Sequence, residues 1–129
     1  MVHAEKLVTV VQRGAANTRW RDFADIYALS HRHDVDGDEL RTATLRVADY
    51  RGTRLMVLDQ ALGDYGRLAE QRWATWLRKQ RMDGQVPGEF RAVLASIGAF
   101  ADPLLLGDVE GQTWSAAQLA WVPTSRAGR

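Results

Sequence analysis

Apolar residues recur at the three- and four-residue spacing of an amphipathic helix in several segments of the chain. The pattern predicts helices over residues 4–12, 18–30, 37–51, 67–82 and 87–102. In the second segment Trp20, Phe23 and Tyr27 form a stripe of the kind that faces a core. The expected fold class is therefore all-α, a bundle of about five helices.

Local start and stop signals support two of these helices. Asp36 can cap the third helix, with Glu39 three residues later as its capping-box partner, and Gly52 can end it. Pro87 suits the opening of the last helix, because its missing N–H is not needed there, and Pro103 should end that helix.

In two segments the spacing of apolar residues does not decide between helix and strand. The stretch TRLMVLDQAL (residues 53–62) is ambiguous between an extended piece and the start of a helix. After Pro103 the helical period is lost, and Trp114 and Trp121 stand among glycines and small polar residues. We therefore expect a helical domain over residues 1–106 and an irregular C-terminal arm over residues 107–129.

Composition narrows the class of protein. The 129 residues fit one domain, and no run of about 18 apolar residues occurs, so we expect no membrane span. His3, Glu5 and Lys6 interrupt the first residues, which argues against a signal peptide and for a cytoplasmic protein. Zero cysteines and three histidines give no support to a metal site.

Charge is balanced over the whole chain but clusters locally. The net charge of +1 gives no argument for a nucleic-acid partner. The helix expected over residues 67–82 nevertheless combines two tryptophans, Trp73 and Trp76, with a group of cations that could bind RNA. These cations are Arg72, Arg78, Lys79 and Arg81. Ordinary amphipathicity is the alternative, and the helical spacing of the tryptophans favours core packing over base stacking.

Four charged residues interleave with the apolar stripe of the second helix: Arg19, Arg21, Asp22 and Asp25. Asp22 and Asp25 are three residues apart, so both can point at one target. Each carboxylate can equally pair with an arginine on its own helix. From spacing alone, structural ion pairs are favoured over a site.

The same residues carry a resemblance to a known family. The stretches EKLVTVVQRGAANTRWRDFADIYAL, DVDGDELRTATLRVADYRG, RWATWLRKQR and AFADPLL resemble the C-terminal, mostly helical half of the AbiEii-type nucleotidyltransferase toxins, which include the mycobacterial MenT toxins. The resemblance covers residues 4–105, and its specific part is a lysine near a helix start followed by an R-x-R-D-x-x-D helix.

The resemblance implies the toxin half of a toxin–antitoxin pair. Such toxins transfer nucleotides from a nucleoside triphosphate to the 3′ end of tRNA, with Mg²⁺ as the metal of the complete enzyme. Carried over to this sequence, Lys6 would contact phosphates and Asp25 would be the catalytic carboxylate, with Asp22 as its neighbour. Arg19 would contact a phosphate or RNA.

One part of the family pattern is missing from this sequence. The family's N-terminal palm, with a glycine-serine turn and paired aspartates that bind magnesium, has no counterpart motif, so we expect the chain alone to be inactive. The chain would then be a remnant of a split gene, the product of a misplaced start, or one chain of an enzyme that a separate palm chain completes. The uncovered side of Lys6 and Asp25 should show an apolar patch or form a homodimer. The alternatives are a non-catalytic module that binds an antitoxin or RNA, and a fragment without function.

Overall fold

The computed structural model describes residues 2–14, 20–63, 65–82 and 84–124. These residues form helices α1 (Val2–Arg13), α2 (Trp20–Arg32), α3 (Gly37–Arg51), α4 (Leu58–Leu62), α5 (Tyr65–Gln80) and α6 (Phe90–Leu106), and strands β1 (Val35–Asp36), β2 (Gln112–Ser115) and β3 (Ala120–Pro123). The predicted helical architecture is confirmed. The ambiguous stretch of residues 53–62 contains the short helix α4, and none of the described helices is long and apolar enough to cross a membrane.

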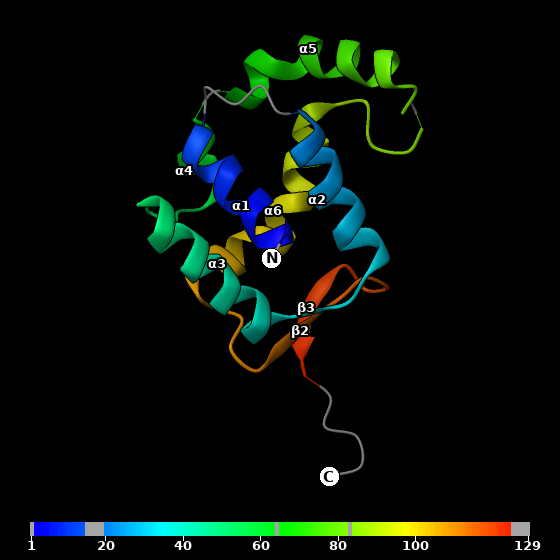
Figure 1. The fold of residues 1–129 in the computed structure, drawn as a ribbon. Coiled ribbons are helices and arrows are strands. Elements are labelled where there is room, and N and C mark those ends of the chain that lie inside the picture. The colour runs from blue at the N-terminus through cyan, green and yellow to red at the C-terminus, as the bar shows by residue number, and fades with distance from the viewer. Residues whose placement is uncertain (1, 15–19, 64, 83, 125–129) are drawn as a thin grey trace.

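Helix α6 is the element around which the others are arranged (Figure 1). It packs against α2 and α5 and also contacts α3, α4 and β3, while α1 packs on α2, α3 and α4. Helix α5 lies across one end of the molecule, and the β2–β3 hairpin lies at the opposite end (Figure 1). The Lys6 region of α1 is thus placed between a helical end and a small sheet.

The capping residues predicted at the two ends of α3 are confirmed. The Asp36 side chain accepts a hydrogen bond from the backbone N–H of Glu39 at 3.0 Å, which satisfies one of the free N–H groups at the helix start. Gly52 ends the helix with φ at 64°, in the left-handed region that favours glycine. Both ends of α3 are therefore specified locally.

The predicted limits of the last helix are wrong at both ends. Helix α6 begins at Phe90 instead of Pro87, because the Glu70 carboxylate of α5 accepts hydrogen bonds from the N–H groups of Phe90 (3.0 Å) and Arg91 (2.7 Å). A carboxylate in this place satisfies free N–H groups and lies at the positive end of the helix dipole.

The helix also continues through Pro103 as far as Leu106. Phe100 and Leu104, on either side of Pro103, are fully buried, so continuing the helix keeps an apolar face in the core. Arg41 of α3 then donates hydrogen bonds from Nη1 to the carbonyls of Leu104 (2.8 Å) and Leu105 (2.9 Å). Tertiary contacts here outweigh the local cost of proline.

The C-terminal arm is present and contains two regular strands. β2 and β3 form an antiparallel hairpin in which Trp114 faces Trp121, and β2 also pairs with β1 through Val35. The indole N–H of Trp114 donates to the carbonyl of Ser30 at 2.7 Å. That of Trp121 donates to the carbonyl of Phe100 at 2.9 Å, so both tryptophans anchor the hairpin to helices.

The core contains two aromatic clusters, one at each end of α6. Phe90 lies at the centre of the first, with ring centroids 4.9 Å from Phe23, 5.2 Å from Trp73 and 5.8 Å from Trp20. The second joins Phe100 to the two tryptophans of the hairpin, with centroids 5.1 Å and 5.6 Å apart. The first cluster fixes the beginning of α2, which carries the candidate site residues.

Candidate functional site

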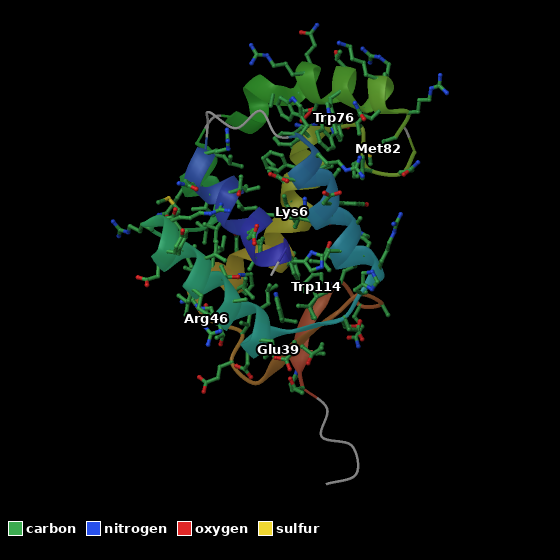
Figure 2. All side chains as sticks on the ribbon, viewed as in Figure 1. Lys6, Glu39, Arg46, Trp76, Met82 and Trp114 are labelled. Carbon is green, nitrogen blue, oxygen red and sulfur yellow. The ribbon has the colours of Figure 1, made fainter. Side chains whose placement is uncertain are left out.

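Lys6 of α1, labelled in Figure 2, forms ion pairs with two carboxylates of α2. Its Nζ atom is 2.8 Å from Oδ2 of Asp25 and 3.3 Å from Oδ1 of Asp22. The three-residue spacing of the two aspartates places both on the face of α2 that meets α1. The structure thus brings together three residues that the resemblance singled out.

One of the two aspartates also forms an ion pair with an arginine on its own helix. Arg21 donates a hydrogen bond from Nε to Oδ1 of Asp25 at 3.0 Å, across one turn of α2. Asp25 therefore joins a cation on its own helix and a cation on the neighbouring helix. Arg19 lies outside the described residues.

The three side chains differ in how far solvent reaches them. The Asp22 side chain is 3% exposed, whereas those of Lys6 and Asp25 are 23% and 30% exposed. Asp22 thus supports Lys6 from the interior, and Asp25 is the carboxylate that a ligand can reach.

Electrostatics keep Lys6 charged. The hydrogen bond to Asp25 raises the pKa of Lys6 above its ordinary value, against the opposing effect of burial, and Asp22 adds to the rise. The ammonium group is consequently cationic throughout the physiological pH range, partly open to solvent and held in place by two helices. An anionic ligand such as a phosphate can reach Lys6 only by taking over part of its contact with the exposed carboxylate of Asp25.

The residues at this site do not fit a magnesium ion. Mg²⁺ needs carboxylates that are open to it, but Asp22 and Asp25 both face the Lys6 ammonium group. Within the described ranges, no group of three or more His, Asp or Glu residues gathers in a way that could hold a metal. A catalytic metal would need ligands other than these.

The basic residues expected to bind RNA lie on and just after α5, away from Lys6. Arg72, Arg78, Lys79 and Arg81 are exposed. Trp73 is fully buried and donates from its indole N–H to the carbonyl of Pro87 at 2.9 Å, which confirms core packing for that residue. Trp76 is half-buried and stacks on Trp73, with centroids 5.5 Å apart.

No apolar patch surrounds the Lys6 site in the described part of the chain. The large apolar side chains that are exposed there belong to α3, to the end of α6 and to the hairpin: Leu45, Tyr50, Leu106 and Leu119. The expected apolar patch on the side of Lys6 and Asp25 is therefore not found.

A feature that the sequence reading missed lies beside Asp25. Arg21, Asp25 and Arg32 follow one face of α2 and, together with Gln85 of the α5–α6 connection, line a partly open pocket of about 170 Å³. The helical spacing of these residues was visible in the sequence. The closure of the pocket by residues about 60 positions away was not.

Comparison with known proteins assigns the chain to a family. The family model described as nucleotidyl transferase AbiEii toxin, type IV toxin–antitoxin system, matches residues 1–117. The search of curated proteins returned no match, and neither did the search of solved structures. The matched range contains Lys6, Asp22 and Asp25 as well as α1 to α6 and β2. The chain therefore belongs to the AbiEii nucleotidyltransferase toxin family.

Proposed function

We propose that this helical chain supplies the nucleotide-facing wall of a toxin that transfers nucleotides from a nucleoside triphosphate to the 3′ end of tRNA. Family membership supports nucleotidyl transfer within a toxin–antitoxin system, with an antitoxin as partner. The observation that carries the residue assignment is the Lys6 ammonium group held between Asp22 and Asp25 on the matched part of the chain.

Lys6 is the group proposed to bind the triphosphate. In nucleotidyl transfer, negative charge accumulates on the phosphate oxygens and on the leaving pyrophosphate, and a fixed cation stabilises that charge. Lys6 meets this need because its pKa is raised and its position is set before the ligand arrives. A phosphate that approaches Lys6 replaces part of its contact with Asp25 and frees that carboxylate.

Asp25 is the carboxylate proposed to act at the reacting hydroxyl. It is the more exposed of the two aspartates, and Arg21 orients it from the solvent side. A carboxylate so placed can accept a hydrogen bond from the 3′ hydroxyl of the acceptor and orient it for attack. Asp22 is a positioning residue, because it is buried and holds Lys6 from behind.

We propose that the residues that bind magnesium belong to another unit. The residues at the Lys6 site do not fit Mg²⁺, and phosphoryl transfer depends on metal ions that bridge the phosphates. We therefore propose a palm unit with metal-binding aspartates that meets the surface beside Lys6. The 129-residue chain without that unit is expected to be inactive.

The test is nucleotide addition to tRNA. Native protein is recovered from its own cells with an antibody to this chain, its intact mass is measured, and it is incubated with tRNA, Mg²⁺ and each labelled nucleoside triphosphate. We expect addition by a preparation that contains a palm, and none by the purified chain of 14.5 kDa. Addition by the purified chain alone would remove the need for a palm. No addition by a palm-containing preparation would refute nucleotidyl transfer.

The exposed cations at α5 favour a second candidate, a non-catalytic module that binds RNA or an antitoxin. Arg72, Arg78 and Lys79 are exposed and can meet phosphates, although their helix is also an ordinary amphipathic one. Toxicity of the native toxin distinguishes the two candidates. Lys6→Ala and Asp25→Ala abolish toxicity if the protein is an enzyme, and leave partner binding intact if it is a binding module.

A further inference from the structure

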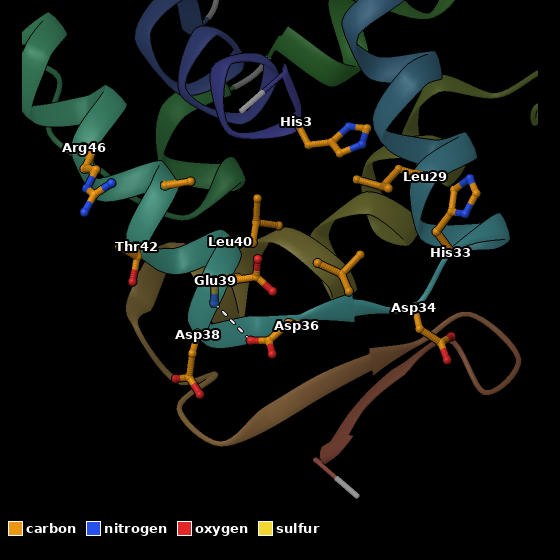
Figure 3. Close-up of a pocket in the computed structure, with 12 residues that line it drawn as sticks. His3, Leu29, His33, Asp34, Asp36, Asp38, Glu39, Leu40, Thr42 and Arg46 are labelled. Carbon is orange, nitrogen blue, oxygen red and sulfur yellow. Dashed lines mark hydrogen bonds between the residues drawn. The ribbon is translucent and has the colours of Figure 1, made fainter.

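A groove with an apolar floor lies at the sheet end of the molecule, and its lining begins at His3 and Leu29, one helical turn from Lys6 and Asp25. Its volume is about 900 Å³, near the upper end of the range of roughly 300–1,000 Å³ typical of ligand pockets. Leu29, Val35, Leu40 and Ala43 contribute apolar surface, with Leu40 near the middle of the view in Figure 3. The groove is open, which suits an extended or helical segment better than a small molecule.

Acidic side chains line one side of this groove. They are Asp34, Asp36, Asp38 and Glu39, and all four are exposed. Arg46 is the cation among the lining residues, so with His3 and His33 taken as neutral the lining carries a net charge of −3. The chain as a whole has a net charge of +1, so negative charge is concentrated here.

The backbone holds three of these carboxylates in place. Asp34 accepts a hydrogen bond from the N–H of Ala116 at 2.9 Å, and Asp36 accepts one from Glu39 at 3.0 Å. Asp38 accepts from the N–H of Gly111 through both oxygens, at 3.2 Å and 3.3 Å. The acidic rim is thus organised before any partner binds, which lowers the entropy lost on association.

The negative charge of the lining indicates which kind of molecule can bind in this groove. A polyanion such as RNA is repelled by the rim, whereas the exposed cations at the α5 end of the molecule attract it. A segment that places apolar side chains on the floor and cations against the carboxylates is complementary in both respects. We propose that the groove binds a basic, amphipathic segment of a partner protein, a function separate from nucleotidyl transfer.

The probe is a fluorescent synthetic helix of about 14 residues with leucine along one face and lysine elsewhere. Its control replaces every lysine with glutamate. Binding to the full chain is measured by fluorescence anisotropy at low and high salt. We expect binding of the lysine peptide, little binding of the glutamate peptide, and weaker binding as salt rises, because the rim charges are exposed.

Two variants in the groove, each with a matched control outside it, test where the peptide binds. Glu39→Lys reverses a rim charge and should weaken binding about tenfold, while Asp49→Lys makes the same change on an exposed residue of α3 outside the groove and should leave binding nearly unchanged. Ala43→Trp should block the floor, and Leu45→Trp on the exposed side of α3 is its control. Circular dichroism establishes that each variant is folded.

Several results would overturn the proposal. Equal binding of the lysine and glutamate peptides would show that the rim does not select charge. Equal loss in Glu39→Lys and Asp49→Lys would place the peptide elsewhere. Self-association of the chain in sedimentation velocity that Glu39→Lys abolishes would make a second copy the occupant. None of these results depends on activity with tRNA, so the groove and the proposed function can fail separately.

Discussion

Replacing Phe90 with leucine tests whether the first aromatic cluster holds α2 in place. Phe90 is fully buried and contacts three aromatic rings, two of them edge to face, at centroid distances of 4.9 to 5.8 Å. Each such pair contributes about 0.5–1.5 kcal/mol beyond burial of area. Leucine retains most of the apolar volume, so the expected loss in free energy of unfolding is about 2–3 kcal/mol.

The assay is urea unfolding followed by tryptophan fluorescence. A small domain has an m-value of about 1–3 kcal/mol per molar urea, so the expected loss lowers the midpoint by roughly 0.7–3 M. Tyr50→Leu is the matched control, because Tyr50 is 92% exposed and its replacement should change stability by less than about 0.5 kcal/mol. A midpoint for Phe90→Leu equal to that of Tyr50→Leu would refute the assigned role of the cluster.

Three further predictions concern contacts between helices. Glu70→Ala removes two hydrogen bonds at the start of α6 and should cost about 1–2 kcal/mol in thermal unfolding, whereas Gln71→Ala, its exposed neighbour, should cost little. Arg41→Met removes two hydrogen bonds to the last turn of α6 and should cost about 2 kcal/mol, again measured by thermal unfolding; a loss below about 0.5 kcal/mol would contradict the capping role. Burial raises the pKa of Asp102 above 3.8, so its charged form opposes folding. Asp102→Asn, which keeps an acceptor for the Leu58 N–H, should therefore be more stable than the wild type above the folded pKa of Asp102. That advantage should vanish below pH 3.8, and urea unfolding across this range measures it.

Features with local causes could be predicted from the sequence. The Asp36 cap and the Gly52 stop lie next to the helix that they bound, so a few residues contain all the information needed. The apolar stripe of α2 predicted a buried face, and of its residues Phe23 is fully buried, whereas Trp20 and Tyr27 are half-buried. The same local logic found the pairing of Arg21 with Asp25 as one of its alternatives.

Features that depend on distant residues could not be predicted in this way. The start of α6 is set by Glu70 of another helix, and its passage through Pro103 is supported by burial on both sides of the proline. The hairpin of the C-terminal arm is joined to the rest of the chain by β1, far away in the sequence, which pairs with β2. These outcomes depend on tertiary contacts, which override local propensity.

The candidate site could be predicted from the sequence only in part. Spacing showed that Asp22 and Asp25 share a face of α2, but it left open what they meet. Lys6 is 16 residues before Asp22, and the family resemblance, not periodicity, linked it to the two aspartates. The structure supplies the contact of 2.8 Å between Lys6 and Asp25.

Lys6 is the proposed phosphate-binding cation of a nucleotide site. The most direct measurement is calorimetric titration of the folded chain with ATP, CTP, GTP and UTP, comparing wild type with Lys6→Met and with Lys79→Met, which removes an exposed cation of α5. Loss of one charge-assisted contact of about 1.5–3 kcal/mol predicts affinity reduced about 10- to 100-fold in Lys6→Met and unchanged in Lys79→Met. Equal affinity in wild type and Lys6→Met, with both proteins folded, would contradict the account.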